Sequence, residues 1–275
     1  DNLVISAACA DDRLAVLQLI EVFERLGVTA RRDSMAKAPD IVLRRNKKIS
    51  NPEGYMLEVS DASIDVYGGG AAGVYYGVQT LLDLLTIEGT TLPCRRIHDW
   101  PALTRRVVYH DCARGKVPSV ETVKALVQRL AHWKINELQL YIENAFTFAK
   151  HPRIGRGYSP YTPEELRDMQ EWCRSHYVKF VPSLTSFGHF EKILMLPEYT
   201  HLGEMPGFRG MPGGTTLCPD DPGSIALVED MYDEFLPLFE SEDFNACGDE
   251  PWELGKGRSK EKAEQIGVGS VYLGF

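Results

Sequence analysis

Short apolar stretches and two longer amphipathic ones alternate along the first 90 residues. Apolar residues recur at helical spacing over residues 11–26, and Gly27 ends that run, as glycine often ends a helix. Residues 55–59 and 64–67 alternate apolar and polar side chains and flank a short polar turn, which predicts a β-hairpin. Further strands are expected at residues 3–5 and 40–43, and a second helix at residues 71–85. Two helices packed on a small sheet predict an α+β domain.

From residue 106 onward, strands and helices are expected in strict alternation. The predicted strands are residues 106–111, 138–142, 179–184 and 244–247, and the predicted helices are 119–132, 162–177, 224–239 and 259–266. Thr162, Pro163 and Glu165 carry the signature of a helix start, with a capping hydroxyl, a proline at the first position and an acid three residues after the cap. Such alternation predicts a parallel sheet.

The number of strand-helix units bounds the fold of this second part. A closed (β/α)8 barrel needs eight units and about 250 residues, whereas this segment offers four. It is therefore either an open four-stranded α/β sheet or half of a barrel. Residues 90–101 contain Pro93 and Pro101 and resemble a linker. We accordingly place one domain at residues 1–92 and a second at residues 93–275.

Composition narrows the class of protein. The chain has 275 residues, 44% of them hydrophobic, and a net charge of −9. That charge argues against nucleic acid as a partner, because phosphate binding requires a basic surface. No stretch reaches the roughly 18 apolar residues of a membrane span, so no membrane partner is expected either. Six widely spaced cysteines without a CxxC pair favour free thiols and a cytoplasmic location. Since the sequence begins at Asp1 and not at Met, a secreted or periplasmic protein whose signal was removed is the alternative.

A glycine run offers a first candidate site. Residues 68–73 fit the G-x-G-x-x-G pattern of dinucleotide-binding proteins, between a strand and a helix. That fold needs a buried parallel strand before the glycines, but residues 64–67 alternate, and no ribose-binding acid follows. We therefore interpret the run as a turn in which Gly73 and Gly77 allow close packing, and we expect no cofactor.

Two adjacent carboxylates are the second candidate. Asp249 and Glu250 follow Gly248 at the end of a predicted strand, and the carboxyl ends of strands carry the chemistry of α/β barrels. Neighbouring side chains of a straight strand point to opposite faces, so both reach one site only if the chain bends, which Gly248 permits. Two close carboxylates raise the pKa of at least one of them, as a general acid for glycosidic cleavage requires. The alternative is a solvated or helix-capping acidic pair before Pro251.

Other residues with suitable chemistry lie near strand ends. His189 follows the third strand and is either a hydrogen-bonding partner for a catalytic carboxylate or an ordinary loop histidine. Arg106 and Arg114 flank the first strand, where arginine forms forked bonds to sugar hydroxyls or takes part in structural ion pairs. Trp252 either stacks on a sugar or packs as an ordinary aromatic. The histidines lack the spacing of metal ligands, so no metal is expected.

Taken together, these residues resemble glycoside hydrolase family 20, the β-N-acetylhexosaminidases. The matches to the motifs of that family are Glu53-Gly54-Tyr55 and Tyr76-Gly77-x-Gln79 in the first domain, Arg106, Asp111 and Arg114 along the first strand, Lys134-x-Asn136, Gly188-His189 and Gly248-Asp249-Glu250. The departures are Val107 in place of a glycine, Ser183 in place of a glutamate and Phe187 in place of a proline. In addition, Tyr141-Ile142-Glu143-Asn144 stands where the family has an H-L-x-D-D segment, with Glu143 as the substitute acid. The chain thus resembles a divergent branch of the family.

The resemblance implies an α/β fold, with a small α+β domain before a partial (β/α)8 barrel of about four units. It implies hydrolysis of terminal, non-reducing β-linked N-acetylhexosamine with retention, in which the 2-acetamido group of the substrate is the nucleophile, without a metal or cofactor. Glu250 would act as acid and base, and Asp249 would orient the acetamido group. Arg106 would bind the sugar hydroxyls O3 and O4, and His189, Glu143 and Trp252 would line the substrate site.

Two alternatives remain. The related family 84 O-GlcNAc hydrolases use paired aspartates, so an Asp-Glu pair argues against them. A non-catalytic carbohydrate-binding fragment is the other, because the second half of a barrel would supply further walls of the sugar pocket. We therefore expect the 275-residue chain alone to be inactive or weak. A half barrel would also expose strand edges, which makes a homo-oligomer possible.

Overall fold

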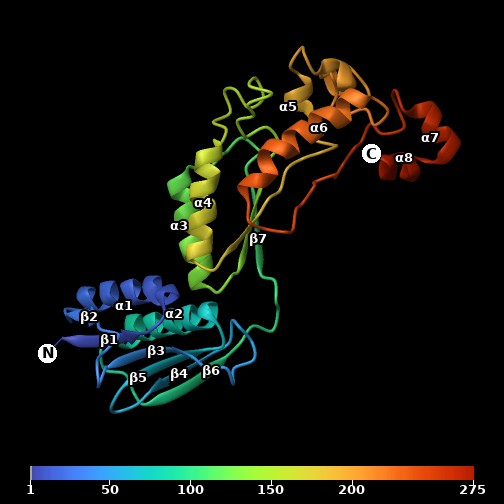
Figure 1. Cartoon of the computed structure of the whole chain (residues 1–275). Coiled ribbons are helices and arrows are strands. Elements are labelled where there is room, and N and C mark those ends of the chain that lie inside the picture. Colours follow the sequence, from blue (N-terminus) through green and yellow to red (C-terminus); the bar gives the residue numbers. More distant parts are fainter. Residues whose placement is uncertain (1) are drawn as a thin grey trace. The chain divides into compact units, whose positions relative to one another are not determined.

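The computed structural model describes residues 2–275, which form two compact units (Figure 1). The first unit contains the chain up to Arg106 together with residues 128–136 and 175–177. The second contains residues 107–127, 137–174 and 178–275. Over the described range, no helix is long and apolar enough to cross a membrane. All six cysteines are free thiols.

A six-stranded sheet forms the base of the first unit, with strand order β2-β1-β3-β5-β4-β6. Its strands are β1 (Leu3–Ala7), β2 (Ala30–Arg32), β3 (Ile41–Arg45), β4 (Tyr55–Val59), β5 (Ile64–Gly68) and β6 (Arg95–Asp99). The predicted hairpin is confirmed, because β4 pairs antiparallel with β5 and brings Leu57 opposite Val66, both fully buried. The pairs β1-β2, β1-β3 and β3-β5 are parallel.

Two helices, α1 (Arg13–Arg25) and α2 (Ala71–Glu88), lie side by side on one face of this sheet (Figure 1). Close packing at the glycine run, predicted above, is confirmed. A Cβ atom on Gly77 would lie 2.5 Å from the Val66 side chain, and one on Gly73 would lie 2.2 Å from the Gly54 carbonyl oxygen. Glycine is therefore required at both positions because α2 packs directly against β5 and against the segment that precedes β4.

The prediction that residues 90–101 form a linker is wrong over part of its length. Strand β6 pairs antiparallel with β4 and places Ile97 opposite Leu57, so the sheet continues past the boundary expected at residue 92. Only one of the five residues of β6 is apolar, as is common for a strand at the edge of a sheet. The apolar pattern therefore carries no signal for β6.

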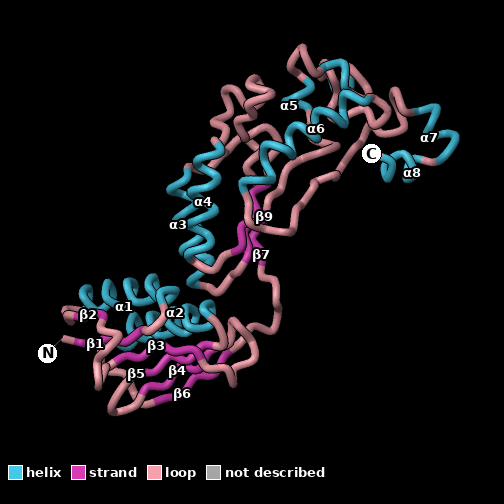
Figure 2. The backbone as a smooth tube through the Cα atoms, viewed as in Figure 1, coloured by secondary structure: helices cyan, strands magenta, loops and turns pink. Residues whose placement is uncertain are grey.

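The second unit is built on three parallel strands in the order β7-β8-β9 (Figure 2). They are β7 (Val107–Asp111), β8 (Glu137–Tyr141) and β9 (Lys179–Val181). The α-helices from here to the end of the chain are α3 (Val120–His132), α4 (Pro163–Ser175), α5 (Glu191–Leu194), α6 (Pro222–Phe235), α7 (Lys260–Ile266) and α8 (Val268–Gly274). Within residues 2–275, short 3-10 helices cover Ala10–Asp12, Thr200–Leu202, Phe208–Gly210 and Leu236–Leu238. The predicted alternation of parallel strands and helices is confirmed up to β9.

The start of α4 follows its sequence signature. The backbone N–H of Glu165 donates to the Thr162 hydroxyl oxygen at 3.2 Å, and the backbone N–H of Thr162 donates to the Glu165 carboxylate at 2.8 Å. The predicted reciprocal cap is therefore confirmed.

A regular fourth strand at residues 244–247 is not formed. Asn245 makes only an isolated parallel bridge to Ser183, in continuation of the sheet order. The backbone of Cys247 has φ +48°, outside the extended region, so strand geometry ends there. The chain nevertheless brings residues 248–250 to the expected end of the sheet, next to the loop after β9.

Candidate active site

Three loops at the carboxyl ends of the parallel strands bring a charged cluster together. Arg114 follows β7, Glu143 follows β8 and His189 follows β9. A guanidinium nitrogen of Arg114 pairs with the Glu143 carboxylate, and the other, Nη2, lies 3.4 Å from His189 Nδ1. Because the ends of parallel strands meet at one edge of a sheet, residues more than 70 positions apart reach a common site.

The acid pair lies on the other side of the His189 ring. His189 Nε2 is 3.3 Å from Asp249 Oδ2 and 3.4 Å from Glu250 Oε2. The two carboxylate side chains are 54% and 52% exposed, whereas Glu143 is 1% exposed. The histidine therefore joins a buried carboxylate region to two carboxylates that a ligand can reach.

Backbone bends bring Asp249 and Glu250 to one site. Cys247 has φ +48° and Glu250 has φ +49°, both in the left-handed region that side chains other than glycine seldom occupy. The chain thus bends as the two adjacent carboxylates require, but at Cys247 and Glu250 and not by a left-handed Gly248 itself. Gly188 has a matching role: a Cβ atom there would lie 2.3 Å from the Asp249 carbonyl oxygen. The absence of a side chain lets the His189 loop rest on the backbone of the acid pair.

Opposite charges hold the buried carboxylate of Glu143. Lys192 Nζ, from α5, lies 3.4 Å from Glu143 Oε2, while Arg114 contacts the other oxygen. Burial disfavours the charged form of Arg114, but the hydrogen bond to Glu143 and the negative charge of that carboxylate together outweigh it and raise the Arg114 pKa. Burial and the negative charges of Glu143 and Asp249 raise the pKa of Tyr141, whose ring lies 6.3 Å from that of His189. Tyr141 therefore remains a neutral phenol beside the cluster.

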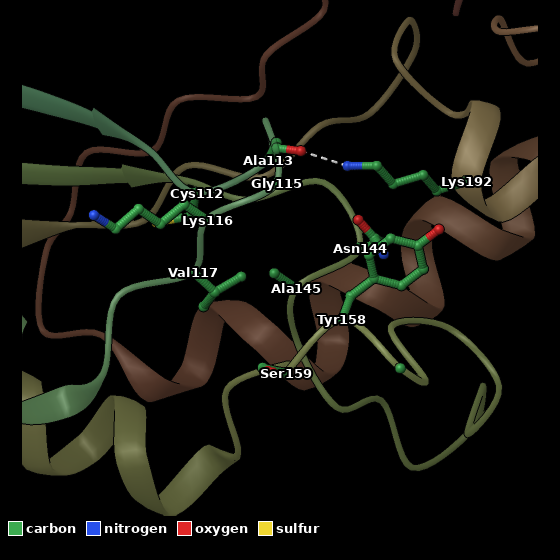
Figure 3. Close-up of a pocket in the computed structure, with 11 residues that line it drawn as sticks. Cys112, Ala113, Gly115, Lys116, Val117, Asn144, Ala145, Tyr158, Ser159 and Lys192 are labelled. Carbon is green, nitrogen blue, oxygen red and sulfur yellow. Dashed lines mark hydrogen bonds between the residues drawn. The ribbon is translucent and has the colours of Figure 1, made fainter.

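A cavity of about 330 Å³ adjoins this cluster (Figure 3). It is enclosed by the segment after β7, the segment after β8 with the loop at residues 157–159, and Lys192. Figure 3 shows the Lys192 ammonium reaching the Ala113 carbonyl oxygen, with Asn144 and Tyr158 close to each other on the same side. The volume is at the lower end of ligand pockets in proteins.

The structure does not bring every predicted site residue to the cluster. Arg106 precedes β7, at the amino end of the strand, where its Nη2 donates to Glu53 at 2.8 Å and its Nε donates to the Lys134 carbonyl at 2.6 Å. The role assigned to Arg106 in sugar binding thus needs correction, and the arginine at the carboxyl end of the same strand is Arg114. Trp252 lies two residues beyond the acid pair with 51% of its surface exposed, and its contact with a substrate stays a prediction.

Three possible ligand atoms lie close together in this cluster. One ligand atom each from Glu143, His189 and Glu191 falls within 4.8 Å of the others. However, the two oxygens of Glu143 already face Arg114 and Lys192, so its charge is neutralised. The donor set therefore fits a divalent cation poorly.

Comparison with known families identifies both parts of the chain. Residues 1–100 match the model described as glycosyl hydrolase family 20, domain 2, and residues 105–266 match glycosyl hydrolase family 20, catalytic domain. Among curated relatives, a β-hexosaminidase of Porphyromonas gingivalis is 28% identical over 229 residues, which is 72% of this chain and 29% of the relative. A β-N-acetylhexosaminidase of Cellulomonas fimi is 27% identical, over 78% of this chain and 47% of the relative. The chain thus spans less than half the length of these two relatives.

Solved structures show the same fold. The exo β-N-acetylglucosaminidase of Vibrio harveyi, in complex with N-acetylglucosamine, superimposes with a TM-score of 0.81 at 21% identity, over 98% of this chain and 48% of that one. A Flavobacterium johnsoniae chitobiase gives a TM-score of 0.82 at 20% identity, over 99% of this chain and 46% of that one. The expected fold is confirmed: an amino-terminal α+β domain precedes part of a (β/α)8 barrel.

Proposed function

Because the chain belongs to glycoside hydrolase family 20, we propose that it acts in the hydrolysis of terminal, non-reducing β-linked N-acetylhexosamine from glycosides. The observation that carries the proposal is the position of His189 between the Arg114–Glu143 ion pair and the exposed pair Asp249–Glu250. The names of the relatives, and the N-acetylglucosamine in the Vibrio harveyi structure, support this substrate class. Membership of family 20 also argues against the alternative that the chain is a family 84 O-GlcNAc hydrolase.

The reaction we propose retains the configuration at C1 and uses the substrate's own acetamido group. Glu250 donates a proton to the glycosidic oxygen as the acetamido oxygen attacks C1 and the C1–O bond breaks. Asp249 orients the acetamido group and stabilises the positive charge that develops on it. Glu250 then takes a proton from the water that opens the ring intermediate, which restores the acid.

The contacts of His189 indicate its tautomer. Arg114 has only N–H donors, so the Nδ1 atom that faces its Nη2 accepts a hydrogen bond. The neutral ring then carries its proton on Nε2, which faces Asp249 and Glu250 at 3.3 and 3.4 Å. We propose that His189 donates to the acid pair and orients it, and that Glu143 fixes Arg114 for this purpose.

We propose that Arg114, and not Arg106, binds hydroxyl groups of the sugar. Its side chain is 51% exposed although it pairs with the buried Glu143, so part of the guanidinium remains available to a ligand. The guanidinium carbon lies 5.7 Å from the centre of the Tyr141 ring, which fixes the plane of the fork. Arg106, by contrast, uses its nitrogens for Glu53 and backbone carbonyls.

Replacement of Glu250 by Gln tests the proposal. The change removes the acid without changing its size, so kcat/KM for an aryl β-N-acetylglucosaminide should fall by about 10² to 10⁴. Glu242→Gln, at an exposed glutamate, is the matched control and should retain activity. NMR of the first-formed product should show the β-anomer. Undiminished hydrolysis by Glu250→Gln would contradict the assignment.

The same hydrolysis assay should be carried out on the 275-residue chain and on any longer gene product that contains it. In the described part of the second unit, the sheet ends at β7 on one side, and on the other side only the isolated bridge of Asn245 continues it beyond β9. We therefore propose that the 275-residue chain alone turns over weakly. Binding of N-acetylglucosamine without hydrolysis in both forms would favour a non-catalytic carbohydrate-binding role instead. We also propose that the protein forms a homo-oligomer. Because its six cysteines are free thiols, we further propose that it is cytoplasmic.

A further inference from the structure

A second, smaller cavity of about 150 Å³ lies within the first unit. It is formed where the end of β6 and the segment up to Arg106 meet the start of β4 and the turn after α3. All of its lining residues belong to this unit, whereas Asp249 and Glu250 belong to the other. None of the residues proposed to act on the substrate contributes to it.

Two tryptophans line this cavity from separate parts of the chain. Trp100 follows β6 and is 57% exposed, and Trp133 follows α3 and is 66% exposed. The ring of Trp100 lies 5.0 Å from that of His98, a contact that restricts its orientation. Single exposed apolar residues are common on proteins, but two tryptophans at one hollow form a surface suited to a ligand with an apolar face.

The polar part of the cavity wall is held in place by ion pairs. Arg106 Nη2 is 2.8 Å from Glu53 Oε2, and Lys134 Nζ is 3.1 Å from Asp99 Oδ2 and 2.8 Å from the Tyr55 hydroxyl. Two cations and two carboxylates balance each other, so the wall selects neither an anion nor a cation. It instead presents fixed hydrogen-bonding groups, which favour a neutral ligand rich in hydroxyl groups.

A buried hydroxyl in the same wall lacks a regular hydrogen bond. Tyr76 is 1% exposed, and among residues 2–275 its hydroxyl oxygen makes no hydrogen bond of regular geometry, although the Arg106 guanidinium lies near it. A buried polar group without a hydrogen bond is destabilising, because it has lost its contacts with water. A ligand hydroxyl at this position would remove that destabilisation. This observation is independent of the two tryptophans.

We propose that this cavity binds one pyranose ring of a saccharide, at a site distinct from the acid pair. The apolar C–H face of the ring would stack on Trp100 or Trp133, and its hydroxyls would meet the charged wall. The volume is below the roughly 300–1,000 Å³ of drug-sized pockets, which suits a single ring. The balanced charges, together with the net charge of −9, disfavour a nucleotide.

The indole N–H signals of the four tryptophans provide the test. We would titrate the ¹⁵N-labelled chain with N-acetylglucosamine and with N,N′-diacetylchitobiose, and assign the signals with Trp→Phe variants. The signals of Trp100 and Trp133 should shift saturably, and that of Trp172 should not. Trp100→Ala and Trp133→Ala should each weaken this binding at least tenfold with no loss of thermal stability, since both side chains are exposed. Leu103→Ala, at a nearby exposed residue, is the matched control.

Two results would overturn the proposal. One is the absence of any saturable shift of Trp100 and Trp133 with either sugar, and the other is binding that survives both Trp→Ala changes. Glu250→Gln should leave the shifts unchanged, because Glu250 is not part of the cavity. Loss of hydrolysis and loss of this binding are therefore observed separately, so the failure of one proposal does not imply the failure of the other.

Discussion

Of the seven non-glycine residues with left-handed backbone angles in the described part of the chain, three lie at the candidate active site: His189, Cys247 and Glu250. For residues other than glycine, such strained conformations cost on the order of 1–3 kcal/mol each and persist only where the surroundings impose them. Here the surroundings are the close contact of Gly188 with the backbone of the acid pair and the ion pairs of Glu143. The geometry of the two reactive carboxylates thus depends on residues that carry no reactive group.

Gly188→Ala should test this dependence. The added Cβ would lie 2.3 Å from the Asp249 carbonyl oxygen, so the loop or the acid pair must move. A displacement of about 1 Å at catalytic groups can lower the rate about 100-fold, and we expect a loss of kcat/KM of that order. Gly269→Ala, where an added Cβ meets no atom within 4 Å, is the control. Wild-type kcat/KM for Gly188→Ala would show that the contact does not position the acids.

Local motifs were sufficient to predict some site residues but not others. Asp249, Glu250 and His189 stand in short motifs whose place at strand ends could be predicted, and the structure brings them together. The choice between Arg106 and Arg114 depended on which end of a strand each occupies, and the rule that chemistry lies at carboxyl ends already favoured Arg114. Lys192 offered no signal, because its role arises from a loop fold that the apolar pattern does not encode.

Among helices and strands, apolar content determined what the sequence could reveal. Strands buried on both faces and amphipathic helices were predicted within a few residues. The polar edge strands β2 and β6 were missed, because an edge strand in contact with water needs few apolar residues. The strand expected at residues 244–247 was reduced to a single bridge by the left-handed turn at Cys247. That turn positions the acid pair. The geometry of the site therefore outweighs the local preference of these residues for a strand.

Loss of the cap on α4 should destabilise the second unit. Thr162→Ala removes the acceptor of the Glu165 backbone N–H, and removal of such a cap costs about 0.5–2 kcal/mol. The midpoint of urea unfolding should therefore fall with an unchanged slope. Thr162→Ser keeps the hydroxyl and should retain most of the stability. Equal midpoints for Thr162→Ala and the unaltered chain would mean that the cap contributes nothing.

Across the chain as a whole, buried titratable groups predict how stability depends on pH. Burial raises the pKa of Cys173 to about 12 and that of Tyr75 to about 12. In the unfolded chain these groups lose their protons near pH 9 and pH 10, respectively, while the native state keeps them. Their contribution is therefore complete below pH 9 and is lost as the pH rises towards 12, at up to about 1.4 kcal/mol per pH unit for each group.

Thermal unfolding between pH 8 and pH 11 provides the measurement. The unfolding temperature should fall steadily above pH 9, and Cys173→Ala, which removes one of the groups, should make the fall less steep. An unfolding temperature that stays constant up to pH 11 would contradict the role of these buried groups.

The first unit contains segments that lie far apart in the sequence, which has a consequence for its synthesis on the ribosome. Its sheet is encoded before residue 100, but Asn136 donates to Glu53, and Tyr177 donates to the Asp11 carbonyl at 2.9 Å. The chain is made from its amino end at about 5–20 residues per second, so these last contacts become available several seconds after β6 has emerged. During that interval the nascent chain displays an incomplete first unit, which lacks Asn136 and Tyr177. Chaperone binding to stalled nascent chains should consequently end only once Tyr177 has left the exit tunnel.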